Sequence, residues 1–207
     1  MIFYILDRVA SWNNPDGFWV FDPFNWTLGD FVDFCPDCGV RLGVKQWLPP
    51  FRAKITGSTR ADLVCGPGRS FLVSDRFMVG WKTNGFRGLR ILGAMEIVGS
   101  PTNKKTAEQE YWNVKPPAVV TRMDESATVF KVHKLVGCDH CRVGQRAEVK
   151  GIRVDESSWT GEDIFYPSGL FGVLLVTEPV AKMIMDLKLT NFRLIHQDEY
   201  TEKWERR

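Results

Sequence analysis

Two cysteine pairs with the same spacing lie far apart in this 207-residue chain. Cys35 and Cys38 form one C-x-x-C pair, Cys138 and Cys141 form the other, and counterparts are 103 residues apart (138 − 35 and 141 − 38). The two-residue spacer lets a tight turn, here called a knuckle, aim both sulfur atoms at one ion. Four thiolates complete the tetrahedral shell of Zn²⁺, so the sequence predicts one zinc ion bound by all four cysteines.

The long separation of the pairs indicates a structural role for the metal. In zinc ribbons the second pair follows the first after about 15 to 20 residues, so this ion would join distant parts of the chain. Four sulfur ligands leave no open position for a water molecule, which disfavours hydrolysis. A redox pair is an alternative, but it would open a helix, whereas Pro36 and Gly137 indicate turns. Another alternative is that the two pairs have lost their metal. The ligand type alone does not distinguish zinc from iron, because four cysteines bind either metal.

The offset of 103 residues recurs outside the cysteines. The similar segments are 72–75 with 175–178, 85–92 with 188–195 and, after a two-residue gap, 62–64 with 163–165. Self-similarity at a fixed period indicates repeated structural units. Coincidence between two common strand-helix-strand patterns is the alternative.

In each half of the chain, the similar segments together predict a strand, a helix and a second strand, in that order. The helices are expected to start after the N-cap residues Ser74 and Thr177, each followed by an acid. Gly85 is expected to end the first helix in a left-handed conformation. The expected core faces are Phe77, Met78 and Trp81 in the first helix, and Val180, Met183 or Ile184, and Leu187 in the second.

These patterns predict an α+β protein with two related halves. Residues 1–103 and 104–207 would each contain a β-α-β unit and one knuckle, and the shared zinc site would make them one compact unit. The boundary is expected at residues 99–103, and the prolines of residues 115–118 favour extended chain. Alternating apolar and polar residues in 128–136 predict a strand.

Composition and charge narrow the class of protein. With 44% hydrophobic residues the chain has enough apolar side chains for a core, and a net charge of +2 gives no strong field for nucleic acid or membrane. The longest apolar run, 169–176, is too short to span a membrane, and Asp7 and Arg8 interrupt the apolar start before it could serve as a signal peptide. Four cysteines in metal-spaced pairs, with Cys65 alone, fit a reducing compartment, and we expect the cytoplasm.

The order of these elements resembles the double-CXXCG motif immunity proteins of bacterial polymorphic-toxin systems. The resemblance is carried by the apolar start (residues 1–6), the Cys35-Pro-Asp-Cys38-Gly39 knuckle, the pair at Cys138 and Cys141, and the segment from Leu175 to Leu194. It implies a non-enzymatic protein that binds and neutralises a cognate toxin domain. Arg142 departs from the family pattern, because a glycine is expected after the second pair.

Aromatic residues among acids are the candidate toxin-binding surface, because buried aromatics anchor interfaces and charges steer association. One group lies near Trp19, Asp22 and Trp26. The other is a predicted loop containing Asp155, Glu156, Trp159 and Glu162. Any of these aromatic rings could instead belong to the core.

Other chemistry has weaker support in the sequence. The three histidines, His133, His140 and His196, have no convincing nucleophile or acid beside them. The alternative is that the chain is a zinc-ribbon module with a nucleic-acid-binding or regulatory role. The sequence signal for it is a basic cluster after the first knuckle. That cluster is made of Lys45, Arg52, Lys54 and Arg60.

Overall fold

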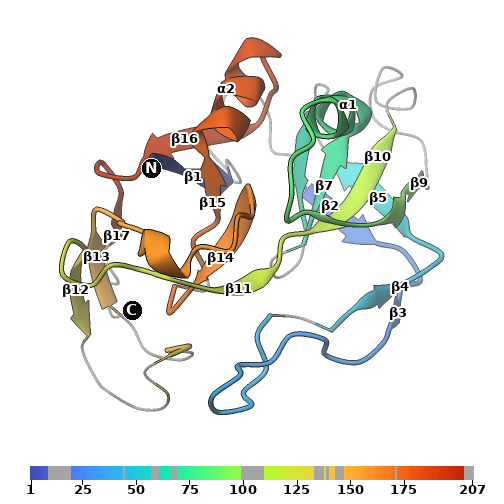
Figure 1. Ribbon diagram of the computed structural model, residues 1–207. Coiled ribbons are helices and arrows are strands. Elements are labelled where there is room, and N and C mark those ends of the chain that lie inside the picture. The colour runs from blue at the N-terminus through green and yellow to red at the C-terminus, as the bar shows by residue number, and fades with distance from the viewer. Residues whose placement is uncertain are drawn as a thin grey trace.

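The computed structural model describes residues 1–8, 20–43, 45–56, 61–66, 70–98, 110–132, 138, 140–142, 147–170 and 172–202. The protein is mixed α+β, built mostly of strands with two α-helices at one end of the molecule (Figure 1). The α-helices have nine residues each, and no helix in the described ranges is long and apolar enough to cross a membrane.

Two large sheets form the body of the molecule (Figure 1). In spatial order, the five-stranded sheet contains β16 (Phe192–His196), β1 (Phe3–Arg8), β15 (Leu175–Thr177), β14 (Ile164–Ser168) and β11 (Ala118–Arg122). The seven-stranded sheet contains β8 (Arg90–Ala94), β10 (Tyr111–Lys115), β7 (Phe71–Ser74), β6 (Leu63–Cys65), β2 (Val20–Pro23), β5 (Arg52–Thr56) and β9 (Glu96–Ile97).

Two small sheets complete the strand inventory of the described ranges. One has the order β12 (Val129–Val132), β13 (Ala147–Lys150) and β17 (Thr201–Glu202), and the other pairs β3 (Thr27–Leu28) with β4 (Trp47–Leu48). The strand predicted over residues 128–136 is therefore present as β12, and its last residues, 133–136, lie outside the described ranges.

The five-stranded sheet has the same pairing pattern as the first five strands of the seven-stranded sheet. In each, three antiparallel pairings are followed by one parallel pairing, β14 with β11 in one sheet and β6 with β2 in the other. The second strand of each sheet comes from the other part of the chain. Strand β1 lies among strands that follow residue 110, and β10 lies among strands that precede residue 100. No motif or periodicity in the sequence indicates this exchange.

The two helices begin where the sequence predicts. Helix α1 (Asp75–Thr83) is capped by Ser74, whose Oγ accepts a hydrogen bond from the Phe77 amide at 3.2 Å. Helix α2 (Glu178–Asp186) starts after Thr177, but the Thr177 hydroxyl makes no capping bond. Gly85 has a φ of +66°, which confirms the left-handed end of α1.

One predicted core residue is wrong. Leu187 is 40% exposed: it is the C-cap residue of α2, still helical in backbone conformation, and its side chain packs on Gly80 of α1 at the surface. The other predicted core residues of both helices are buried: Phe77, Met78, Trp81, Val180, Met183 and Ile184.

A single apolar cluster joins both helices to both large sheets. Leu63 and Val73 of the seven-stranded sheet pack in it together with Ile164 and Val176 of the five-stranded sheet. The helices pack on each other at Gly80, where an added Cβ would lie 2.7 Å from a methyl group of Leu187. The two sheets therefore share this cluster, and each sheet also has a cluster of its own.

Two carboxylates at equivalent places join the sheets to the helices. The Ser74 hydroxyl donates to Asp62 Oδ1 (2.6 Å), and the Thr190 amide donates to Asp62 Oδ2 (2.8 Å). The Thr177 hydroxyl donates to Asp163 Oδ1 (3.0 Å), and the Arg87 amide donates to Asp163 Oδ2 (2.8 Å). Each carboxylate thus binds the start of the helix nearest in sequence and a loop from the other part of the chain.

Replacing Asp62 with asparagine tests this link. Asp62 is 2% exposed, and an amide nitrogen at Oδ2 would face the Thr190 amide with a donor instead of an acceptor. We expect Asp62→Asn to lower the free energy of unfolding by about 2 to 3 kcal/mol, measured by urea denaturation. The control is Asp186→Asn, whose exposed pair with Lys182 contributes less than about 0.5 kcal/mol. Equal effects of the two variants would contradict the prediction.

Candidate metal centre

The first knuckle (residues 34–41) is a tight turn closed by backbone hydrogen bonds. The Cys35 amide donates to Val40 O and the Gly39 amide donates to Cys35 O, both at 2.9 Å. Gly39 has a φ of +67°, a left-handed conformation that glycine adopts without strain. This turn follows β3 on an arm, here residues 24–48, that extends from the seven-stranded sheet at the opposite end from the helices (Figure 1).

The second knuckle (residues 138–142) keeps the same turn although it lacks the glycine. The Arg142 amide donates to Cys138 O at 3.0 Å, as the Gly39 amide does to Cys35 O. Arg142 has a φ of +49°, so an arginine occupies the left-handed position at a cost of about 1 to 2 kcal/mol. The departure from the family pattern at Arg142 therefore leaves the knuckle intact.

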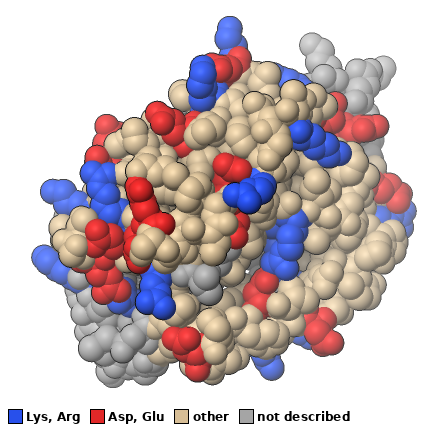
Figure 2. All heavy atoms as spheres, viewed as in Figure 1, with Lys and Arg blue, Asp and Glu red and all other residues tan. Residues whose placement is uncertain are grey.

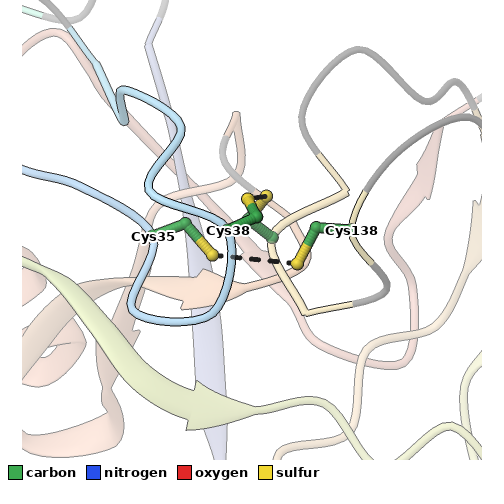
Figure 3. Close-up of side chains that lie close together, drawn as sticks. Cys35, Cys38 and Cys138 are labelled. Atoms are coloured by element: carbon green, nitrogen blue, oxygen red, sulfur yellow. Dashed lines mark hydrogen bonds between the residues drawn. The ribbon is translucent and has the colours of Figure 1, made fainter.

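The four cysteines predicted as ligands come together (Figure 3). The Sγ atoms of Cys35 and Cys138 are 3.8 Å apart and those of Cys38 and Cys141 are 3.7 Å apart. All four sulfur atoms lie within 4.8 Å of one another, and none is in a disulfide. Sulfurs about 2.3 Å from a central ion in a tetrahedron are about 3.8 Å apart, so the cluster is of the right size to hold a metal ion.

The environment of the cluster favours a thiolate at Cys35. At Cys38 the Val40 amide lowers the pKa, but burial and hydrogen bonds with Cys35 and Cys138 outweigh it and raise that pKa. Cys35 and Cys141 are buried beside Leu42, whereas Cys38 is exposed. Burial opposes ionisation of Cys35, but backbone amides of Cys38 and Asp37 and the neighbouring thiols donate hydrogen bonds that hold its pKa below the ordinary value. A thiolate is the form that binds a metal.

One polar contact bridges the two knuckles beside the sulfurs. His140 Nδ1 lies 3.3 Å from Asp37 Oδ2, and the His140 carbonyl accepts a hydrogen bond from the Ser168 hydroxyl at 3.0 Å. Our sequence reasoning missed this pair. The offset offered a signal, because Asp37 and His140 occupy equivalent positions in the two knuckles (140 − 37 = 103).

A second anchor holds the arm near its middle. The Asp33 carboxylate pairs with Lys115 of β10 at 2.5 Å and with Arg90 of β8 at 2.8 Å. Burial opposes ionisation of Asp33, but hydrogen bonds and charge attraction from Lys115 and Arg90 outweigh it, so the pKa of Asp33 lies below its ordinary value of 3.8. The arm is thus fixed at the cysteines and at the edge of the seven-stranded sheet.

The proposed toxin-binding residues lie in separate parts of the fold. Asp22 is exposed on β2, and Trp26 on the arm is 45% exposed with its ring edge against Trp47. Trp19 lies outside the described residues.

The second proposed group belongs to the loop before β14. Asp155 accepts a hydrogen bond from the Ser157 amide at 3.0 Å, and Glu156 pairs with the amino terminus. Trp159 is half-buried against Phe3, and its indole N–H donates to the carbonyl of half-buried Glu162 at 3.0 Å. Its ring therefore packs on the core, which makes Trp26 the better exposed anchor.

The basic cluster of the alternative function is largely engaged within the protein. Arg52 pairs with Glu96 through two hydrogen bonds of 2.9 and 3.0 Å. Lys45 lies over the Phe31 ring and Lys54 over the Phe24 ring, and Arg60 lies outside the described residues. On the face drawn in Figure 2, basic and acidic groups are interspersed.

Comparison with known proteins adds no identification: no protein-family model matches the chain, and no curated protein is significantly similar to it.

Removing one sulfur tests the shared site. We expect Cys138→Ser to reduce the metal content below one ion per chain and to lower the midpoint temperature of thermal unfolding. The reason is that three remaining thiolates leave the four-ligand shell incomplete. The measurements are metal analysis by mass spectrometry and thermal unfolding. Cys65→Ala is the control, because Cys65 is buried in β6, and this variant should keep its metal. A Cys138→Ser protein that keeps both metal and stability would contradict a shared site.

The Asp33 anchor predicts a pH dependence. A depressed pKa means that the charged carboxylate stabilises the fold above its unfolded-state pKa, and that this stabilisation is lost as the pH falls through the folded-state pKa. We expect the wild-type protein to exceed Asp33→Asn in unfolding free energy by about 1 to 2 kcal/mol at pH 7. The difference should shrink below pH 3.8, measured by urea denaturation at a series of pH values. A difference that is the same at pH 7 and pH 3 would contradict this assignment.

Proposed function

We propose that this chain is an immunity protein that binds and neutralises a cognate toxin domain of a bacterial polymorphic-toxin system. The observation that carries the proposal is the four-sulfur cluster, which holds two segments about a hundred residues apart at one point. The resemblance in motif order supplies the class of partner. Inhibition by direct binding requires a preformed surface, and a metal tie between distant segments favours one.

We propose zinc as the ion, in a structural role. Zinc's preferred shell of four thiolates matches the donor set and the sulfur separations of 3.7 and 3.8 Å. Cys35, Cys38, Cys138 and Cys141 would bind it and leave no position for a reacting water. A reducing cytoplasm would keep these thiols available.

We also propose that the two halves arose by internal duplication. The strand order shared by the two large sheets supports it, as does the equivalence of α1 with α2 at an offset of 103 residues (178 − 75). The matching carboxylates Asp62 and Asp163 add support beyond the strand pattern. A fusion of two copies would place one knuckle in each half, and the C-x-x-C pairs begin at Cys35 and Cys138, one in each half of the sequence.

The arm is the surface that we propose for toxin binding. Besides Trp26 it exposes Leu28, Val32 and Phe34, which are 41 to 51% exposed, and Asp22 lies in the strand that leads into it. Exposed apolar side chains gathered on one segment are typical of protein interfaces. Because the metal fixes the end of this arm, zinc loss would weaken toxin binding indirectly.

The growth of bacteria that express the toxin domain tests the proposed immunity function. Cells that express the toxin domain encoded beside this gene should grow when they also express this chain, and Cys138→Ser should protect less. Continued killing despite folded, metal-containing protein would overturn the proposed function.

Trp26 tests the interface. We expect Trp26→Ala to weaken toxin binding by at least about tenfold, because an exposed tryptophan is the residue type most enriched among binding hot spots. Calorimetry measures the affinity, and thermal unfolding shows that the variant remains folded. The control is Met185→Ala on α2, where the methionine is 56% exposed. If both variants bind as tightly as the wild type, Trp26 is not in the interface.

A further inference from the structure

A polar cleft lies beside the second knuckle and has no role in the proposed metal site. Its volume is 470 Å³, and its walls combine both knuckles with the carboxyl ends of β11 and β14. These two strands are parallel, and their last residues, Arg122 and Ser168, are partners in register. The residues that line this cleft therefore come from four separate segments of the chain.

The charged groups in the cleft are paired except for one. Arg142 pairs with Glu125, and His140 lies beside Asp37. The Arg122 backbone amide donates to the Ser158 hydroxyl, but its exposed guanidinium makes no hydrogen bond or ion pair with any residue that the structure describes. Arg122 thus offers a planar set of donors at the mouth of a polar cleft.

Gly169 lies in the wall of the cleft in a left-handed backbone conformation. This glycine has a φ of +83°, and an added Cβ would lie 3.4 Å from the His140 carbonyl and 3.8 Å from Arg142 Nη1. These are ordinary van der Waals distances, so a larger residue at this position would be disfavoured by the left-handed backbone and not by a clash. The two knuckle side chains that line this wall, His140 and Arg142, are only 12% and 11% exposed, so they are held in place.

We propose that this cleft binds a single carboxylate through the Arg122 guanidinium. A carboxylate accepts two parallel hydrogen bonds from a guanidinium, the strongest pairing available to Arg122. A monoanion fits better than a dianion, because Arg122 is the one guanidinium lining the cleft without a partner among the described residues, and because Glu125 and Asp37 also line the cleft. The carboxylate belongs either to an acidic side chain of a protein partner or to a free small acid. The inference does not depend on the proposed immunity function.

Nuclear magnetic resonance titration of the metal-containing full chain tests the site. The probes are acetate, inorganic phosphate, and the capped peptide Ala-Ala-Glu-Ala-Ala with its glutamine counterpart. We expect acetate and the glutamate peptide to shift the amide signals of Ser168 and Gly169 in a saturable way. Arg122→Gln should weaken this binding at least about tenfold. The matched control is Arg193→Gln, which removes an exposed arginine of β16 far along the chain and should bind as the wild type does.

The outcomes separate the sources of the carboxylate. Tighter binding of the glutamate peptide than of acetate would assign the site to an acidic segment of a protein, and equal binding would assign it to a free acid. Unchanged binding by Arg122→Gln, tighter binding of phosphate than of acetate, or no saturable shift would each overturn the proposal. One metal ion per chain in both variants shows that a loss of binding does not come from a damaged knuckle.

Discussion

The exchange of two interior strands, each next to an edge strand, is the constraint on which the fold depends. Strand β1 makes backbone hydrogen bonds to β15 on one side and β16 on the other, and β10 does the same between β7 and β8. Removing either strand would expose two rows of unpaired backbone groups in the interior of a sheet. The two parts of the chain therefore cannot separate without breaking both sheets, and the shared core under α1 and α2 follows from this pairing. Asp62 and Asp163 reinforce the same crossing at the helix starts.

The four cysteines lie beside the smallest of the buried apolar clusters in the described residues. Within the part of the chain that the structure describes, the apolar cluster at the knuckles contains only Cys35, Leu42 and Cys141 as buried members, whereas the cluster under the helices has seventeen. So small a cluster contributes little by burial alone, because apolar stabilisation scales with the area removed from water. Metal binding and the Asp33 ion pairs would therefore supply much of the local stability of the arm. In the proposed function this matters directly, since the arm is the surface offered to the toxin.

Local features were predictable from the sequence, but the pairing of distant segments was not. The capping residue Ser74, the left-handed Gly85 and the C-x-x-C spacing each act within a few residues, so the helix starts and the ligand set could be derived. Strand β1 has an apolar pattern that fits any buried strand, and nothing in it indicates β16, more than 180 residues later, as its neighbour. The contacts of His140 and Arg142 could not be derived for the same reason, because they depend on how the knuckles face each other. Leu187 keeps the helical periodicity as the C-cap of α2, but its side chain packs on Gly80 of α1 at the surface instead of entering the core.

The proposed duplication gives a physical reason for the differences between the knuckles. In a symmetric pair of identical knuckles, equivalent residues would face each other, and two aspartates beside four thiolates would repel. A single chain allows the two positions to differ, and here Asp37 faces His140. The same freedom applies to Gly39 and Arg142, which share a left-handed turn but differ in side chain. Arg142 lines the cleft beside the second knuckle, whereas Gly39 has no side chain to build an equivalent wall beside the first. The differences between the knuckles therefore have two effects. They avoid a repulsion between two aspartates beside the cysteines, and they confine the proposed carboxylate site to the side of the second knuckle.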